Sequence, residues 1–364
     1  MEKPYLREGV DIYVEDNDSN ITTVIFVFLS TRKRIQMKVR KNLVASLPLF
    51  NGENSIDDIL AKTKSSRSEL EKFVSYLELN GILLPKNWLE NIRLDANYKG
   101  AIEKQLYFLM DILNSPEAVS DLQKRILQTK IAIIGVGSTG SWMLVELLQM
   151  GFQDFKLFDY KNVKEDSISR HAFFEQIAIG RQKAIHYKEI AKKINPAATI
   201  ESHAISINTD MEVFEKLHDI DLIINCADEP YIGYTSIFLS RYSIKYNKIL
   251  FVAGGFDAHL GCLGELIVPY KTPCSDCYNE FFKESLKDWK PSPHPVKDRI
   301  KGFGGLPALS VFSASTGALI ILRYFINKQE FIKTAGGRGE FKFDDYKIDA
   351  FDVKRNEKCE VCGE

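Results

Sequence analysis

The sequence predicts an α/β protein with a Rossmann-like, mostly parallel sheet, helices on both faces of that sheet, and a small additional unit at the N-terminus. Two observations predict this class. From Lys130 onward, short apolar runs alternate with segments of helical spacing, the pattern of a sheet between helix layers. The first run, KIAII at 130–134, leads into Gly135, Gly137 and Gly140 and then a helical segment, which is the glycine spacing of a dinucleotide-binding fold.

Length and composition limit the class of protein further. The chain has 364 residues and 45% hydrophobic content, enough for two domains or one large domain with an appendage. Its net charge of −1 supplies no global field that attracts nucleic acid or an anionic membrane. The apolar run at 22–29 is too short to span a bilayer, and the N-terminus lacks a signal pattern. We therefore predict a cytoplasmic protein without a nucleic-acid or membrane partner.

Residues 1–95 are predicted to form a winged-helix-like unit. Two strand-like runs, ITTVIFVFL and RIQMKVR, precede segments of helical spacing that begin at Ser or Asn. The region holds 14 Lys and Arg against 14 Asp and Glu, so it lacks the basic footprint that binding to DNA phosphates requires. An exposed strand edge can instead accept an extended peptide. We predict that this unit is a peptide clamp.

Residues 96–364 form the predicted nucleotide-binding part. A helical segment from about Tyr98 to Lys124 leads into a region where strands and helices alternate. The second strand ends at Asp159 in KLFDY, where a carboxylate accepts hydrogen bonds from ribose hydroxyls, while phosphates are favoured at the helix N-terminus after the glycines. A set of turn glycines with a surface Asp is the plain alternative. The expected strands are KIAII, FKLFD, ATIESHAI, DLIINCA and KILFVAGG.

Charged residues after Asp159 favour ATP over NAD as the ligand. Arg170 lies in SISRH and Lys183 in GRQK; nucleotidyl transfer needs cations where negative charge develops, whereas hydride transfer has no evident need of them. Taken singly, each residue is better explained as a solvated surface cation. Asp228 in CADEP stands at the end of the fourth strand, where a carboxylate can hold Mg²⁺ or cap the next helix.

Four of the six cysteines form two C-x-x-C pairs. Four thiolates supply the closed, tetrahedral shell of a structural Zn²⁺ site, and an intracellular chain uses such pairs for metal more often than for disulfides. Free or redox-active cysteines are the alternative. The predicted zinc ligands are Cys274, Cys277, Cys359 and Cys362.

This ordered set of motifs resembles the ThiF/MoeB/HesA family, the bacterial relatives of ubiquitin-activating enzymes, over about residues 100–364. The resemblance implies that a carboxylate attacks the α-phosphate of ATP to give an acyl-adenylate and pyrophosphate. It also implies a homodimer in which EKQLYF at 103–108 lends a cation, Lys104, to the partner subunit's site. The implied ATP-binding residues are Gly135, Gly137, Gly140, Asp159, Arg170 and Lys183, with Asp228 as the Mg²⁺ ligand.

The chain departs from the family pattern at four positions. Ser167 and His171 replace the common Asn and Gln around Arg170, and Lys161 replaces a second Asp. Lys104 replaces Arg and lacks its planar fork. These changes admit altered activity or a catalytically silent protein.

The stretch 278–305 contains no cysteine, although sulfur-transferring and ubiquitin-activating members often carry one there. With its N-terminal unit and without a cysteine in this stretch, the chain resembles the peptide-modifying branch of the family, which acts on microcin C-like or pantocin-like precursors. The leading hypothesis is Mg-ATP-dependent adenylation of a carboxyl or amide group on a ribosomally made precursor peptide, in the biosynthesis of a peptide antibiotic. A silent leader-peptide-binding scaffold and an NAD-dependent oxidoreductase are the alternatives.

Overall fold

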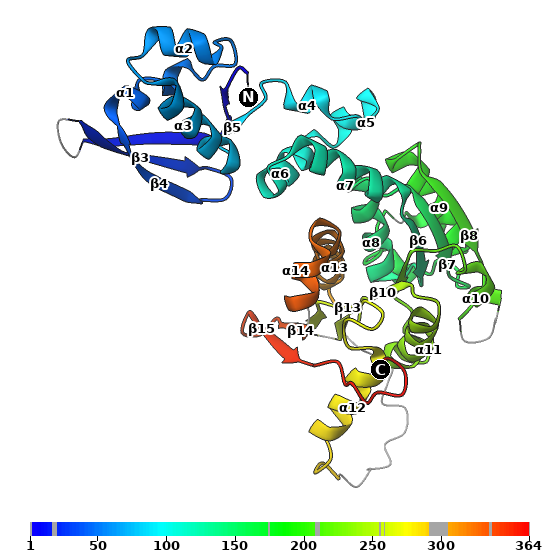
Figure 1. The fold of residues 1–364 in the computed structure, drawn as a ribbon. Helices are drawn as coiled ribbons and strands as arrows, with labels where there is room; N and C mark the ends of the chain where they lie inside the picture. The colour runs from blue at the N-terminus through cyan, green and yellow to red at the C-terminus, as the bar shows by residue number, and fades with distance from the viewer. Residues whose placement is uncertain are drawn as a thin grey trace. The chain divides into compact units, whose positions relative to one another are not determined.

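The chain folds into two compact units, Met1–Leu122 and Gln123–Glu364, which are considered separately (Figure 1). Residues 96–122, predicted with the second part of the chain, lie within the first unit; the functional division into 1–95 and 96–364 stays a prediction. Half of the cysteine-free stretch, residues 291–304, lies outside the described residues. The computed structural model describes residues 2–16, 20–173, 175–207, 212–254, 256–257, 259–290, 305–334 and 337–363.

The first unit is built around an antiparallel sheet with strand order β2-β3-β4. The two predicted strands are β3 (Ile21–Phe28) and β4 (Arg34–Arg40). β2 (Val10–Asp16) pairs with β3 along its whole length; its run VDIYVED alternates but carries three acidic residues, and the sequence did not predict it. The central strand buries Val24 and Phe26 completely, as the two-residue period of a strand with one core face requires.

Helices follow the sheet and cover its apolar face. α2 (Ile56–Lys62) and α3 (Arg67–Leu79) both begin at capping boxes, at Ser55 and Ser66, which satisfy the free amide groups of the first turn. α3 buries one apolar stripe, including Leu70 and Leu77, in the same core as Phe26. The smaller elements are β1 (Tyr5–Leu6), α1 (Lys41–Val44), η1 (Leu47–Leu49), β5 (Leu83–Leu84), α4 (Trp88–Asn91), α5 (Ala96–Ala101), α6 (Glu103–Leu113) and α7 (Pro116–Gln128), whose last residues belong to the second unit.

The second unit contains a six-stranded sheet with strand order β13-β10-β9-β6-β7-β8. Five strands are parallel and β13 (Glu265–Ile267) is antiparallel, so the predicted mostly parallel sheet is confirmed. The three central parallel strands are near-continuous apolar runs because helices cover both of their faces, whereas the edge strand at Thr199–His203 buries only Ile200. The parallel strands are β6 (Lys130–Ile134), β7 (Asp154–Phe158), β8 (Thr199–His203), β9 (Leu222–Asn225) and β10 (Ile249–Val252).

The two faces of this sheet carry different helices. α8 (Ser138–Gln149) packs against α9 (Lys183–Ile194) and α13 (Pro307–Ile326) on one face. α10 (Glu212–Lys216) and α11 (Ile232–Lys245) share a core with the other face. The helices change from one face to the other because every crossover is right-handed. The crossovers from β6 run along the sheet in one direction, and the crossovers from β9 run in the opposite direction. The point between β6 and β9 is therefore a switch point, where open α/β sheets bind ligands.

α13 is long and apolar enough to cross a membrane, yet half of its most apolar window is buried in the protein. It lies against α8 and the sheet. Gly317 permits this close packing, because a Cβ there would lie 2.7 Å from the Phe251 ring. These contacts are those of a core helix.

A smaller antiparallel sheet follows, with strand order β11-β12-β14-β15. It brings the last part of the chain back to α12 (Ser275–Ser285), beside which the C-terminus lies in Figure 1. The remaining elements are β11 (Phe256–Asp257), β12 (Leu260–Cys262), α14 (Lys328–Thr334), β14 (Gly337–Lys342) and β15 (Lys347–Asp352).

Candidate active site

The loop between β6 and α8 requires glycine at two of its three predicted positions. Gly135 has a φ of +88°, and a Cβ there would lie 3.0 Å from the backbone of Cys226. A Cβ on Gly140 would lie 2.0 Å from the carbonyl oxygen of Gly135. Gly137 differs, because the nearest described atom to its Cβ would be His171 Nε2, at 4.0 Å. The space beside Gly137 is open enough for a ligand to approach the backbone.

The N-terminus of α8 presents its amide groups to this space. Gly137 is the N-cap residue and provides no side-chain cap, so the first-turn N–H groups are available to an anion. Ser138 donates its hydroxyl to the carbonyl oxygen of Arg170 at 2.9 Å and contacts Ser310 Oγ at 2.6 Å. These contacts hold the segment around Arg170 against the start of α8.

Asp159 lies directly after β7 and is 8% exposed. Its carboxylate accepts hydrogen bonds from the backbone N–H groups of Val136, at 3.1 Å, and Lys161, at 2.8 Å. Burial raises the pKa of Asp159, while the Lys161 amide and the charge of Lys183 oppose that shift. The predicted ribose acceptor therefore lies against the glycine loop and is fixed by backbone donors on both sides.

Lys183 begins α9 and is 7% exposed. Its Nζ lies 3.5 Å from Nε2 of His171. His171 donates its Nδ1 proton to the Ser167 carbonyl oxygen at 2.8 Å, which leaves Nε2 as the acceptor that faces the ammonium. Burial and then the charge of Lys183 lower the pKa of His171 to about 3, so the imidazole is neutral at physiological pH.

Two of the four positions where the chain departs from the family pattern lie in one chain of contacts that ends at a predicted phosphate contact, although Ser167 takes part through its backbone carbonyl oxygen, which any residue there would supply. Ser167 orients His171, and His171 contacts Lys183. The sequence identified the three residues but not this chain of contacts, since tertiary structure brings Lys183 to a residue on another segment. Burial lowers the pKa of Lys183, and Asp159 opposes that shift. A buried cation in this position gains most from an incoming anion.

Arg170 follows η2 (Glu165–Ser167) in the segment between β7 and α9. Its side chain is 39% exposed and forms an ion pair with Asp166 at 3.2 Å. An exposed pair of this kind contributes little to stability, so the guanidinium is able to exchange Asp166 for a phosphate. Gln182, which the sequence analysis did not single out, caps α9 and contacts the Asp159 carbonyl oxygen.

Asp228 is exposed in the loop after β9. Asn225, fully buried at the end of β9, orders this loop, because it accepts a hydrogen bond from the Ala227 N–H at 3.1 Å and donates to hydroxyls of α11. Next to Asp228, Glu229 forms an ion pair with Lys161 from the loop after β7. The loops after β7 and β9 are therefore tied together on either side of the glycine loop.

These contacts place most of the predicted nucleotide residues at the carboxyl ends of β6, β7 and β9. The exception is Lys104, exposed on α6 with its Nζ 6.0 Å from the centre of the Tyr107 ring. It belongs to the first unit, so its role and the homodimer stay predictions. The gathered residues are Gly135, Gly137, Gly140, Asp159, Lys183 and, through its backbone, Arg170. Asp228 stands exposed after β9, and its role as the Mg²⁺ ligand stays a prediction.

The four cysteines of the two C-x-x-C pairs come together in a buried cluster. Their sulfur atoms all lie within 4.8 Å of one another, and three pairs are separated by 3.5 to 3.8 Å. Four thiolates around Zn²⁺ at ~2.3 Å lie ~3.8 Å apart in a tetrahedron. The cluster is thus compatible with zinc, and it joins Cys274 and Cys277, at the start of α12, to Cys359 and Cys362 near the C-terminus.

The glycine loop, the acid after the second strand and the buried cation that begins α9 lie together at one edge of the sheet. The model of the ThiF family matches residues 111–361, more than half of the chain. This chain belongs to the ThiF family. The predicted family resemblance is confirmed, and with it a family whose chemistry implies ATP and Mg²⁺ as ligands.

Relatives of this ThiF-family chain include adenylating proteins of eukaryotes. It is 22% identical over 245 residues to the adenylyltransferase and sulfurtransferase UBA4 of Candida albicans, covering 66% of this chain and 52% of the relative. It is 27% identical over 187 residues to the ubiquitin-like modifier-activating enzyme 5 of Drosophila melanogaster, covering 48% and 45% of the two chains. The ThiF-family chain spans about half the length of these relatives.

Solved structures agree over a longer part of this ThiF-family chain. Escherichia coli MccB with AMPCPP and MccA superimposes with a TM-score of 0.72, 19% identity and 100% coverage of both chains. PaaA superimposes with a TM-score of 0.60 and 18% identity, covering 78% of this chain and 92% of its own. The likeness extends through both units in MccB and confirms the predicted fold class.

Proposed function

We propose that this protein uses Mg-ATP to adenylate a carboxyl or amide group of a ribosomally made precursor peptide. The observation that carries the proposal is the buried Lys183 ammonium, which lies beside neutral His171 and near Asp159 at the open end of the glycine loop. A buried cation at a helix N-terminus is suited to stabilise the charge of a transferred phosphoryl oxygen.

In the proposed reaction, a peptide carboxylate oxygen forms a bond to the α-phosphorus of ATP. The bond from that phosphorus to the bridging oxygen breaks, and pyrophosphate leaves with the bonding electrons. Lys183 and Arg170 stabilise the charge that develops on the phosphate oxygens, and Asp159 accepts hydrogen bonds from the ribose. Asp228 would hold Mg²⁺, which would supply positive charge to the phosphates of the nucleotide.

A peptide substrate is supported by the named ligands of the structural neighbours. MccB is recorded with ATP and, separately, as a microcin C7 biosynthetic enzyme in complex with N-formylated MccA. The first unit of this chain presents β2 and β4 as the outer strands of its three-stranded sheet. A free strand edge accepts an extended peptide through main-chain hydrogen bonds, which supports a clamp role for residues 1–95.

A sulfur-transfer role like that named for UBA4 is less well supported. Apart from the four clustered cysteines, the chain holds Cys226 and Cys262. Burial raises the pKa of both thiols, and a thiol is a nucleophile only as its thiolate. We therefore propose that the acyl-adenylate is captured within the peptide or retained as a nucleotide adduct, and that zinc in the four-cysteine cluster is structural.

The proposal is tested by the products formed from ATP in the presence of the peptide encoded beside the gene. We expect pyrophosphate as one product, and either AMP-linked peptide or free AMP as the other. We expect Lys183→Met to slow pyrophosphate release by about 10²- to 10³-fold, as loss of a transition-state contact does. Lys188→Met, an exposed cation on the same helix, is the matched control and should keep full activity. Formation of ADP, or peptide binding without nucleotide consumption, would overturn the proposal; the second result would favour a silent scaffold.

A further inference from the structure

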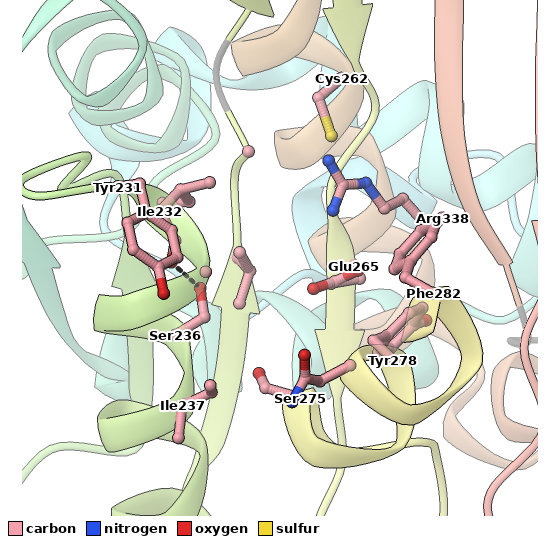
Figure 2. Close-up of a pocket in the computed structure, with 14 residues that line it drawn as sticks. Tyr231, Ile232, Ser236, Ile237, Cys262, Glu265, Ser275, Tyr278, Phe282 and Arg338 are labelled. Atoms are coloured by element: carbon pink, nitrogen blue, oxygen red, sulfur yellow. Dashed lines mark hydrogen bonds between the residues drawn. The ribbon is translucent and has the colours of Figure 1, made fainter. Parts of the chain in front are cut away.

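Buried charged side chains occur in two places apart from the residues assigned to ATP. Figure 2 shows the first, a cavity of about 150 Å³ in the second unit that Glu265 and Arg338 line. Tyr231, on one wall, is three residues beyond Asp228, so this cavity adjoins the proposed adenylation site. The second place is centred on Arg7 and lies wholly within the first unit. The proposed chemistry uses none of its residues.

Arg7 directly follows β1 and is 7% exposed. Its guanidinium forms an ion pair with Asp111 of α6. It also donates hydrogen bonds to the side-chain oxygen of Asn114, at 3.3 Å, and to the carbonyl oxygen of Gly81, at 3.5 Å. Asn114 is the C-cap of α6, and Gly81 follows the C-cap of α3. One side chain therefore joins the N-terminal strand to the ends of two helices. We call these four residues the Arg7 joint.

The packing around the joint leaves little freedom. Gly81 has a φ of +69°, and a Cβ there would lie 2.3 Å from the side-chain oxygen of Asn114. One turn before Asp111 on the same face of α6, the Tyr107 ring meets the edge of Trp88, with 5.1 Å between the ring centres. Trp88 is 6% exposed. α6 is thus held against residues 1–95, the predicted peptide clamp, at two successive turns.

The chemistry of the joint favours a role in geometry over a role in stability. A buried ion pair is weak evidence for stability, because taking two charges out of water costs about as much as their attraction returns. A planar guanidinium, however, directs its hydrogen bonds along fixed lines. With acceptors on α6 and at the end of α3, Arg7 fixes how the two helices lie against each other.

The segment that the joint fixes is the one that leads to the nucleotide site. α7 (Pro116–Gln128) begins two residues after Asn114 and ends two residues before β6 and the glycine loop. The division between the two units falls within this helix, after Leu122. The chain that connects the predicted clamp to the ATP-binding residues therefore passes through the end of α6 that Arg7 holds.

We propose that Arg7 and Asp111 are positioning residues, which keep the connection between the peptide clamp and the ATP site stiff. The inference rests on the proposed function, because it takes residues 1–95 to bind the peptide that the second unit adenylates. A tethered reactant acts at an effective concentration that falls when its tether gains freedom. Loosening the joint should therefore slow adenylation of the bound peptide and leave the affinity for the peptide unchanged.

The kinetic test compares Arg7→Met with Arg93→Met, which changes an exposed arginine of the same unit. We expect Arg7→Met to lower the rate of pyrophosphate release at saturating precursor peptide by about tenfold or more, with the half-saturating peptide concentration unchanged. Arg7→Lys keeps the charge without the planar fork and should recover part of the rate. Arg93→Met should match the unchanged protein in both quantities.

Amide hydrogen exchange of the full chain tests the joint without ATP or peptide. In Arg7→Met the amides of α6 should exchange at least about tenfold faster, while those of β3 and α3, in the core of the clamp, keep their protection. If Arg7→Met also loses the protection of β3, Asp111→Asn carries the same comparison, because it removes the charge of the pair and keeps an acceptor of the same shape.

Two results would overturn the positioning role. One is unchanged exchange of the α6 amides in a folded joint variant. The other is a folded joint variant whose rate at saturating peptide equals that of the unchanged protein, or whose only change is a higher half-saturating concentration. A failure of the proposed adenylation differs from both, since the unchanged protein itself would then release no pyrophosphate.

Discussion

At the scale of single residues, His171 holds the cation on which the proposed chemistry depends. Its Nε2 faces the ammonium of Lys183, and its Nδ1–H donates a hydrogen bond to the Ser167 carbonyl oxygen. Protonation of the imidazole would place a second positive charge against Lys183 inside the protein. His171 must therefore be neutral in this arrangement. It stands at the position where the family pattern has Gln, so a side chain that titrates takes the place of an amide that does not.

This replacement predicts a pH dependence of stability. The pKa of His171 falls from 6.5 to about 3 on folding, so the unfolded chain binds the proton more readily, and stability is lost as the pH falls from 6.5 towards 3. At pH 5 we expect the unchanged protein to have lost about 2 kcal/mol that His171→Gln retains. Urea unfolding of the second unit at pH 7.5 and pH 5 measures this difference. Parallel pH dependences of the two proteins would contradict the assignment of a buried, neutral imidazole.

At the scale of elements, the turn from β6 to α8 separates steric from functional demands on glycine. Gly140 is needed because a side chain would strike Gly135, whereas the space beside Gly137 is open. Glycine at position 140 is therefore needed for the turn to fold. Glycine at position 137 leaves room for the ligand that approaches the helix N-terminus.

Two alanine variants distinguish these demands. Gly140→Ala should lower the melting temperature without nucleotide, because its Cβ would lie 2.0 Å from the Gly135 carbonyl oxygen. Gly137→Ala should leave the melting temperature unchanged and weaken ATP binding by about tenfold or more, since a methyl group would occupy the path of the phosphates. Calorimetry of both variants, with and without ATP, checks this. Full ATP affinity in Gly137→Ala would show that phosphates do not approach the helix there.

The C-terminal residues are joined to α12 through the four-cysteine cluster, which predicts an effect of metal removal. Zinc bound by four thiolates contributes its binding free energy to folding. We expect a strong chelator to release about one Zn²⁺ per chain and to lower the melting temperature of the second unit. We expect Cys362→Ser to lower the same melting temperature. Metal analysis of the purified protein checks the stoichiometry. A protein that holds no zinc and melts at the same temperature with chelator would contradict a structural metal site.

Local patterns in the sequence were sufficient to predict some elements but not others. The glycine turn and the C-x-x-C pairs were predictable because each is contained in a few consecutive residues. β13 was not predicted, since three residues are too few to display alternation. The cavity could not be predicted either, because Glu265 and Arg338 come from strands of different sheets.

At the scale of the whole molecule, the assignment of Lys104 distinguishes a site made by one chain from a site shared by two. If each site uses Lys104 of the partner subunit, a Lys104→Ala chain and a Lys183→Met chain are both inactive alone. A heterodimer of the two contains one intact site. We therefore expect an equal mixture of exchanging subunits to recover about a quarter of the unchanged activity. Mixing before the pyrophosphate assay measures this recovery, and its absence in a confirmed heterodimer would contradict the shared site.

The measurement that tests the central claim most directly is the exchange of labelled pyrophosphate into ATP. Adenylation is reversible while the acyl-adenylate stays bound, so the account predicts that label enters ATP when protein, Mg-ATP and the precursor peptide are all present, and that Lys183→Met suppresses the exchange while Lys188→Met does not. ATP consumption to ADP and phosphate with no exchange of pyrophosphate, or exchange that does not require a peptide, would contradict it.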